Sequence, residues 1–174
     1  MRTLLASIAT LCALAATVSG CAITSSSSPT GSSTTVTTTP PSAVGTTLTL
    51  NDGTGDTITV TLLRFQDPAT PARPKDAPPA GDNLAEVLIK VTGVTGTYQD
   101  QATTAVAVVG SDGQAYSAGS QSLAGCVSFK SGEFTVKAGQ SVTGCVAVEI
   151  KKSIKPVQIE YDAGYVGTTG TWSP

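Results

Sequence analysis

The chain has 174 residues and carries ten basic and twelve acidic side chains, which gives a formal net charge of −2 at neutral pH. This mildly acidic balance argues against a nucleic acid as partner, because binding to a phosphate backbone needs clustered positive charge. The sequence contains no histidine, so it lacks the commonest general base and the commonest metal ligand. We therefore expect no enzymatic activity, no cofactor and no resident metal.

The chain begins with a segment typical of a secretory signal. Arg2 precedes an apolar run over residues 4–18, which is too short for a permanent membrane-spanning helix. A Val-Ser-Gly tripeptide (residues 18–20) then leads into Cys21. This arrangement resembles the recognition site of the lipoprotein-processing signal peptidase. The resemblance implies that the thiol of Cys21 is modified with diacylglycerol and that the chain is cut just before it.

We therefore expect residues 1–20 to be a lipoprotein signal peptide, and Cys21 to anchor the protein on the extracytoplasmic face of a bacterial cell membrane. Each buried methylene contributes about 0.8 kcal/mol, so two or three acyl chains hold a protein where one binds reversibly. Two alternatives stay open. Ordinary cleavage near residues 19–22 would release a secreted, antigen-like protein, and an uncleaved signal would itself serve as the anchor.

Residues 21–45 are predicted to form a disordered tether. After the cysteine the segment is built from Ser, Thr, Pro and Gly with few apolar residues and no charge, so it cannot bury enough surface to fold. A flexible coil of this length spans roughly 25–30 Å, which would lift a domain clear of lipid headgroups. Its composition resembles the O-mannosylated stalks of actinobacterial lipoproteins, although the same composition serves equally well without sugars.

Residues 46–174 are predicted to form one all-β domain, because β-branched residues alternate with polar ones and no segment has helical spacing. Seven to nine strands of this kind suit an antiparallel β-sandwich. The clearest predicted strands are 46–50, 57–66, 84–92, 103–109, 134–136, 142–150 and 157–161.

Glycine-containing turns separate several of these strands. Residues 51–53 (Asn-Asp-Gly) follow the first strand, and Asp112–Gly113 gives the signal of a tight hairpin leading into residues 114–117. Residues 137–140 (Lys-Ala-Gly-Gln) separate the next two strands. We therefore expect consecutive strands to be antiparallel neighbours, with residues 134–150 forming a hairpin.

Cys126 and Cys145 are the thiols that remain for the folded domain, because Cys12 leaves with the signal and Cys21 carries lipid. In an oxidising compartment they are expected to pair. The bond would close a loop of about 20 residues and contribute roughly 3 kcal/mol in the chain-entropy model. Cys145 lies off the valine face of its strand, so the bond would staple the side of a sheet. Two free buried thiols are the alternative.

A set of turn glycines and core aliphatic residues across residues 46–172 resembles a known family. The family is the uncharacterised immunoglobulin-like domain of Gram-positive and actinobacterial lipoproteins, which is related in fold to a small secreted mycobacterial antigen. The resemblance implies an immunoglobulin-like antiparallel β-sandwich and supplies no catalytic residues. Lys151 and Gly93 depart from the pattern, because the family often has proline and asparagine there. The matching positions are 58–65, a proline-rich loop, Gly81 before 84–91, Asp112–Gly113 with Tyr116, the glycine-punctuated run 136–150, and Trp172.

Acidic residues offer two weak candidate sites. Asp52 and Asp56 flank a glycine-rich turn that would offer carboxylate oxygens to Ca²⁺, but their spacing differs from an EF-hand loop and favours a solvated hairpin. A serine hydrolase is not expected, since no Gly-x-Ser-x-Gly motif exists. If carboxylates alone supported catalysis, Asp67, Asp82 and Glu149 would be the first residues to test.

Two further sets of side chains each allow a binding and a structural interpretation. A basic cluster near a strand end would contact anionic lipid or glycan, or would be a solvated turn. Its members are Lys151, Lys152 and Lys155. Aromatic residues scattered along the domain would line a ligand groove, or would form the edges of the core. These are Tyr98, Tyr116, Tyr161, Tyr165 and Trp172.

The proline-rich loop over residues 67–83 is the candidate interaction loop, because its prolines stiffen a segment that carries Arg73 and Lys75. A tolerated insertion is the alternative. We expect a lipid-anchored extracytoplasmic binding module of the bacterial envelope, with an envelope protein or glycan as partner. A carrier or chaperone for a small lipid or metal ligand is the alternative function.

Overall fold

The computed structural model describes residues 40–129, 132–164 and 166–174. The described part of the chain forms ten strands, a one-turn helix α1 (Ala102–Ala105) and a 3-10 turn η1 (Pro74–Asp76). The all-β prediction is therefore confirmed, with ten strands in place of seven to nine. No helix within these residues has the length and apolar character to cross a membrane. The strands are β1 (Thr47–Asn51), β2 (Thr57–Gln66), β3 (Asp82–Thr95), β4 (Thr97–Gln101), β5 (Val106–Gly110), β6 (Ala115–Gly119), β7 (Glu133–Lys137), β8 (Ser141–Lys151), β9 (Pro156–Asp162) and β10 (Thr169–Trp172).

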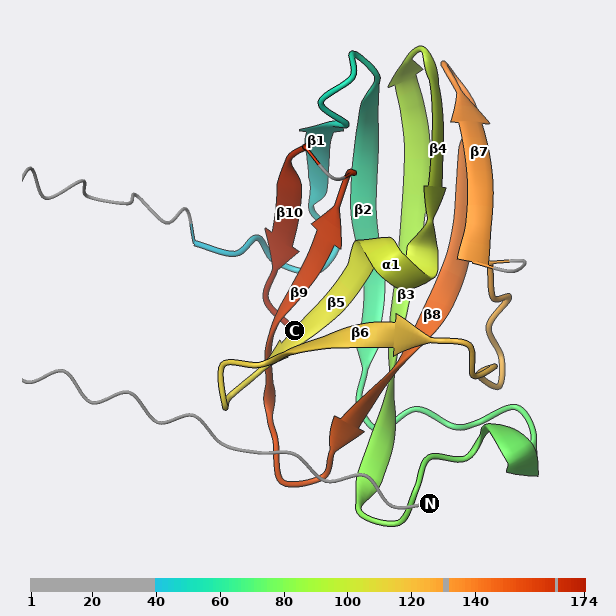
Figure 1. The fold of residues 1–174 in the computed structure, drawn as a ribbon, viewed down its shortest axis with the longest axis vertical. Coiled ribbons are helices and arrows are strands. Elements are labelled where there is room, and N and C mark those ends of the chain that lie inside the picture. The colour runs from blue at the N-terminus through green and yellow to red at the C-terminus, as the bar shows by residue number, and fades with distance from the viewer. Residues whose placement is uncertain (1–39, 130–131, 165) are drawn as a thin grey trace, which may run out of the picture. The chain divides into compact units, whose positions relative to one another are not determined.

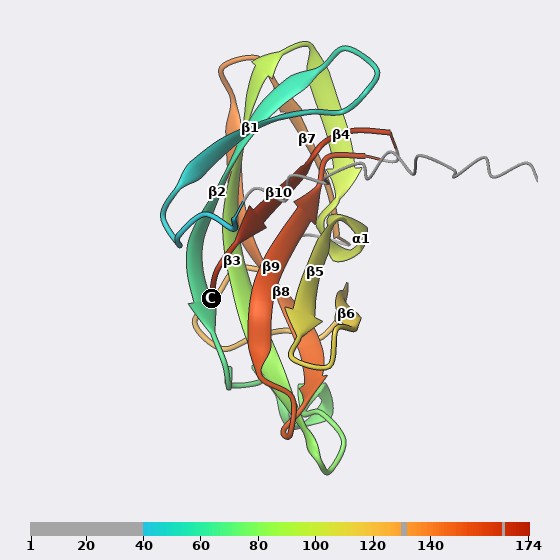
Figure 2. The same ribbon diagram turned by 90° about the vertical axis from the view of Figure 1, so that its left-hand side faces the viewer.

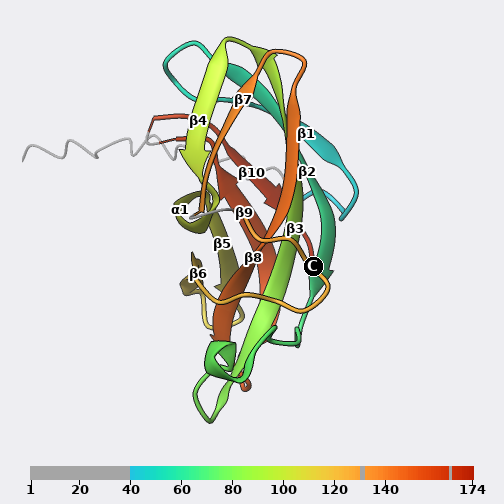
Figure 3. The same ribbon diagram turned by 90° about the vertical axis from the view of Figure 1, so that its right-hand side faces the viewer.

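Eight strands form one antiparallel sheet in the order β1-β2-β3-β8-β6-β5-β9-β10 (Figure 1). The sheet has two halves, β1-β2-β3-β8 and β6-β5-β9-β10, which are joined where β6 pairs with β8. That join is short, because Ala118 pairs with Val148 and Gly119 with Ala147 before β6 ends. The remaining strands, β4 and β7, form a separate two-stranded ribbon (Figure 3). The two halves enclose one apolar core, as expected for a sandwich.

The outer strands of the sheet approach each other, with β10 close to β1 (Figure 2). Ser42, just before β1, pairs with the end of β10, because its N–H donates to Thr171 and its carbonyl accepts from Ser173, at 2.9 and 2.7 Å. The buried indole of Trp172 donates to the carbonyl of Thr46 at 2.9 Å. Ser42, which the sequence analysis assigned to the tether, thus pairs with the β10 edge of the sheet.

Strand periodicity explains the core. In β2, Ile58, Val60 and Leu62 are buried and alternate with threonines, as period two requires. A β-bulge between Leu62 and Arg64 shifts the register, so that Leu63 faces solvent. In the central strands β3 and β8 the buried residues run consecutively, because both faces of this pair are covered.

Two sequence predictions fail around the β4–β7 ribbon. The predicted strand 103–109 begins at Val106, because Ala102–Ala105 form a helical turn that buries Ala102 and Ala105. The predicted hairpin over residues 134–150 is also wrong. β7 pairs with β4 and β8 pairs with β3 and β6, so the turn at residues 138–140 passes between sheets. Strands β4 and β10 were not predicted from the sequence pattern.

Candidate functional site

A cavity of about 510 Å³ opens where β6 ends and the chain crosses the face of β8. Helix α1 forms one wall, the segment after β6 forms a second, and residues of β8 form the base. Small-molecule sites in proteins enclose about 300–1,000 Å³, so the cavity has the size of a ligand site. Its lining residues are Thr103, Thr104, Ala118, Gly119, Ser120, Gln121, Ser122, Ser128, Phe129, Gly132, Cys145 and Val146.

The lining is polar but uncharged. Among the described residues that line the cavity, five carry hydroxyl groups, one carries a carboxamide and none is ionisable apart from the disulfide-bonded Cys145. The side chain of Gln121 donates from Nε2 to Glu149 at 3.4 Å. Its Oε1 is buried and has no hydrogen-bond partner among the described residues. A buried acceptor without a donor is costly, so Gln121 is a strained polar group beside the cavity.

Phe129 supplies the aromatic part of the lining, and its position depends on Gly144 behind it. A Cβ atom at Gly144 would lie 2.9 Å from the Phe129 ring, so the bare backbone of β8 lets the ring pack directly against it. On its other side Phe129 contacts Phe134 of β7, with ring centroids 5.1 Å apart. The ring is thus held between β8 and the β4–β7 ribbon, which fixes the shape of this wall.

A disulfide holds in place the wall that Ser128 and Phe129 form. Cys126 bonds to Cys145, the N–H of Cys145 donates to the carbonyl of Val127 at 3.1 Å, and Ser128 forms a parallel bridge with Cys145. Cys126 also packs against a small apolar cluster on the outer face of the sheet, outside the main core. The predicted pairing and its position on the side of a sheet are confirmed, and two free thiols are excluded.

A second, smaller hollow of about 410 Å³ adjoins the cavity, and Thr104 lines both. Asp100 and Glu133 give it acidic character, and Gln99 and Gln101 complete it. The carboxamide of Gln101 donates to Glu133 at 2.9 Å. The two hollows together form a depression with a neutral end and an acidic end.

Two buried tyrosines hydrogen-bond to the Asp100 carboxylate that lines the acidic hollow. The hydroxyl of Tyr98 donates to Asp100, and the hydroxyl of Tyr161 donates to the same oxygen at 3.1 Å. Desolvation raises the pKa of Tyr98 and of Tyr161, and the negative charge of Asp100 adds to both shifts. Both phenols therefore remain protonated as hydrogen-bond donors and hold the Asp100 carboxylate at the rim.

The fold is similar to that of MPT63, a secreted protein from Mycobacterium tuberculosis. The two share 18% sequence identity with a TM-score of 0.57, over 78% of this chain and 97% of MPT63. A second similar structure is YcdA, a candidate lipoprotein from Bacillus subtilis, with 11% identity and a TM-score of 0.45 over 67% of this chain and 36% of YcdA. No family model matches the sequence, and no curated protein matches it. The expected fold relation to a secreted mycobacterial protein is confirmed, whereas membership of the immunoglobulin-like lipoprotein family stays a prediction.

The predicted interaction loop lies beside the cavity segment and not in the cavity. Arg73 forms an ion pair with Asp76 at 2.7 Å and donates to the hydroxyl of Ser122 at 3.1 Å. The hydrogen bond from Arg73 lowers the pKa of Asp76. Lys75 is exposed. Arg73 thus ties the loop to the polypeptide that forms the cavity wall, and a role of this loop in docking stays a prediction.

The aromatic groove considered from the sequence does not form from the described residues. Tyr98, Tyr161 and Trp172 are buried in the core. Tyr116 is half-buried and donates to Asp112 at 2.8 Å. Tyr165 lies outside the described residues. The core-edge interpretation is therefore correct for the buried residues of this set.

The acidic turn between β1 and β2 is organised by Asp52. Its Oδ1 accepts hydrogen bonds from the N–H groups of Thr54, Gly55 and Asp56 at 2.8–3.0 Å. The hydroxyl of Thr54 also donates to Asp52, and these bonds lower its pKa. The carboxylate thus serves the turn, as in an Asx-type turn. No group of three acidic or cysteine side chains that would hold a metal is found in residues 40–129, 132–164 and 166–174.

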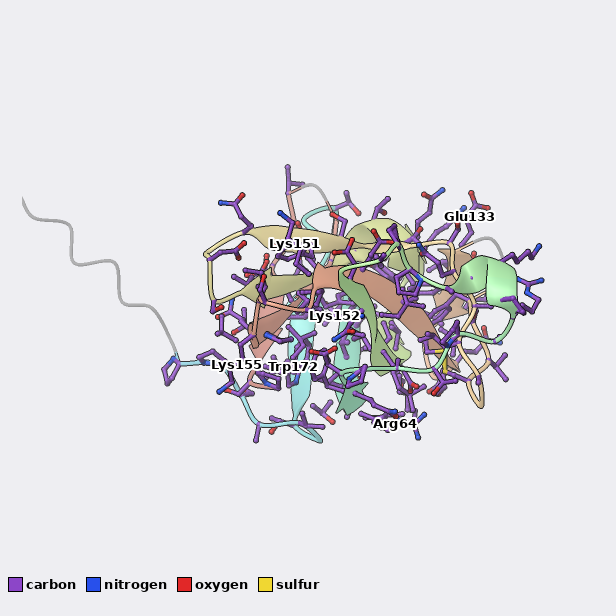
Figure 4. The ribbon with its side chains drawn as sticks, turned by 90° about the horizontal axis from the view of Figure 1, so that it is seen from below. Arg64, Glu133, Lys151, Lys152, Lys155 and Trp172 are labelled. Atoms are coloured by element: carbon purple, nitrogen blue, oxygen red, sulfur yellow. A yellow bond between two sulfur atoms is a disulfide. The ribbon has the colours of Figure 1, made fainter. Side chains whose placement is uncertain are left out.

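The remaining candidates lie at the opposite end of the domain from that turn. Lys151, Lys152 and Lys155 are exposed around the turn between β8 and β9 (Figure 4). The β3–β8 register places Asp82 opposite Lys151, and Glu149 opposite Leu84. Cys21, the predicted lipidation site, lies outside the described residues. Ser120, Gln121 and Ser128, which line the cavity, had no signal in the sequence, because serine and glutamine in a loop are typical of solvent-exposed segments.

Proposed function

We propose that the protein is a binding module of a bacterial envelope that takes its ligand in the polar cavity beside α1. The observation that carries the proposal is the cavity itself, which is of ligand size and is lined by hydroxyl groups and by Gln121. Its walls come from α1, β6 and a segment crosslinked to β8, and such supported walls favour a preformed site. The proposed role is binding without catalysis, and the expected partner is a component of the envelope.

We also propose that lipid on Cys21 anchors this module on the extracytoplasmic face of the membrane. The support is the Val-Ser-Gly-Cys sequence at residues 18–21 after an apolar signal. MPT63, which shares the fold, is a secreted protein, and this agrees with export of the present chain. Intact mass spectrometry of protein extracted from its own membranes tests the anchor. A mass gain from acyl groups that is lost in Cys21→Ala supports it, and an unmodified species overturns it.

The cavity is tested by nuclear magnetic resonance on the chain from residue 21 carrying Cys21→Ala. Solubilised envelope fractions of the producing bacterium are added to the ¹⁵N-labelled protein. We expect amide shifts concentrated in the residues that line the cavity. Ser120→Trp, at an exposed lining position, should block the cavity and abolish the shifts. Ser153→Trp, in the exposed turn after β8, is the matched control and should preserve them. Shifts that persist in Ser120→Trp would refute the cavity as the site.

A further inference from the structure

The hydrogen-bonding groups of the cavity restrict its ligand. Thr103, Thr104, Ser120, Ser122 and Ser128 carry hydroxyls, each of which both donates and accepts. The buried Oε1 of Gln121 accepts and has no donor among the described residues. Thr104 already donates to the carbonyl of Gln101, and Ser122 accepts from Arg73. A ligand that fills this space without polar groups would desolvate the remaining hydroxyls without giving them partners, which is unfavourable. A lipid chain is therefore a poor match for this lining.

Charge restricts the ligand further. Within the described residues the lining itself is neutral, which favours a neutral ligand over an ionised one. Carboxylates stand close by on two sides. Glu149 bonds to Gln121, and Asp100 and Glu133 line the adjoining hollow. These three groups disfavour an anionic ligand in particular.

The apolar groups of the lining complete the pattern. Phe129, Ala118 and Val146 contribute carbon surface to the same cavity. A pyranose ring combines hydroxyls on its rim with an apolar C–H face, so it satisfies the hydroxyls and the carbon surface at once. We infer that the cavity binds an uncharged saccharide whose hydroxyls bond to the polar side chains of the lining, Gln121 among them. This inference rests on the proposed binding function and names the ligand class of that site.

The ligand class is tested with small probes of matched size on the chain from residue 21 carrying Cys21→Ala. Maltotriose and the trimer of N-acetylglucosamine are the neutral probes. Trigalacturonate is the anionic probe, and the glucosamine trimer is the cationic one. A blocked trialanine peptide and decanoic acid represent the other classes. Amide shifts and isothermal calorimetry should show binding of at least one neutral saccharide, with about tenfold weaker binding of both charged trimers.

A matched pair of substitutions tests the role of Gln121. Gln121→Leu removes the acceptor and should weaken binding of the neutral saccharide about tenfold. Gln114→Leu makes the same change at an exposed position in the β5–β6 hairpin and should have no effect. Ser128→Ala removes one lining hydroxyl with little risk to folding and should weaken binding about threefold or more. Thermal melting confirms that each variant is folded.

The outcomes separate the inference from the proposed function. Cavity shifts with the peptide, the fatty acid or a charged trimer, but not with the neutral saccharides, overturn the saccharide and leave the binding site standing. Tenfold tighter binding of the glucosamine trimer than of its acetylated form also overturns it. Neutral saccharides that bind equally to Gln121→Leu overturn the assigned hydrogen bond. If envelope fractions shift no cavity amide, the proposed function itself fails.

Discussion

The two faces of the β3–β8 pair are covered in different ways. On the inner face, Val87, Ile89 and Val148 pack against the opposite half of the sheet in one continuous apolar cluster. On the outer face, Leu84 and Ala147 meet Leu123 in a small separate cluster. That outer cover is loop, and the disulfide, the Arg73–Asp76 ion pair and backbone hydrogen bonds hold it down.

This difference explains where a binding site can exist in so small a domain. Tightly packed aliphatic side chains leave little space, because protein interiors are as dense as organic crystals. The loop cover has few aliphatic side chains and is fixed by a crosslink, so it can span β8 without filling the space next to α1. The cavity thus lies at the edge of the loop cover, where Phe129 and Val146 of the main core cluster meet Cys145 and the segment after β6.

Truncation of one side chain on each face of β3 should give the largest effects. Ile89→Ala on the inner face is expected to reduce the free energy of unfolding by about 3–5 kcal/mol. Leu84→Ala on the outer face should cost about 2–3 kcal/mol, because the loop cover can relax into the space. Urea unfolding of the two variants measures both values. A larger loss for Leu84→Ala would contradict the proposed division between the faces.

Removal of the disulfide should affect the outer face selectively. The paired substitution Cys126→Ala and Cys145→Ala opens a loop closed across a sequence separation of 19 and should reduce stability by roughly 3 kcal/mol. Amide hydrogen exchange should become faster in residues 120–129, while β2 and β9 lose protection only in proportion to global stability. Reduction of the wild-type protein should reproduce the pattern. Unchanged relative protection of residues 120–129 would show that the crosslink does not hold the cavity wall.

Gly144 of β8 lies behind Phe129, which belongs to the main core and also lines the cavity. Its substitution should therefore affect both stability and the cavity wall. A Cβ atom there would lie 2.9 Å from the Phe129 ring, and Gly144→Ala should cost about 1–3 kcal/mol through overpacking. Phe129→Leu should recover part of the loss in the double variant, because the crowded ring is gone. Thr143→Ala, at the exposed neighbouring position, should change stability by less than about 0.5 kcal/mol. Denaturant unfolding of the four variants completes the cycle.

Sequence pattern predicts the inner face better than the outer one. The strand predicted at residues 57–66 matches β2, because its threonine alternation reflects one buried face. The cysteine pair was predictable from compartment and count, whereas Ser120 and Gln121 acquire their role from where the crosslink places them.

Gly93 shows a further limit of prediction from sequence pattern. A Cβ there would lie 2.4 Å from the carbonyl of Lys137, and this close approach of two distant segments leaves no periodic signal in the chain.

The tyrosine pair beneath Asp100 should give the smallest effect at neutral pH and a distinct pH dependence. Tyr161→Phe removes a hydrogen bond to Asp100 and should cost about 1 kcal/mol at pH 7. The native pKa of Tyr98 and of Tyr161 is raised above the ordinary value of 10.0. Above pH 10 the unfolded chain therefore loses phenolic protons that the native state retains, so stability is full below pH 10 and falls as pH rises beyond it. Urea unfolding between pH 8 and 11 should show a shallower decline in Tyr161→Phe than in the wild type. Equal slopes in the two proteins would mean that the buried phenol of Tyr161 does not control alkaline stability.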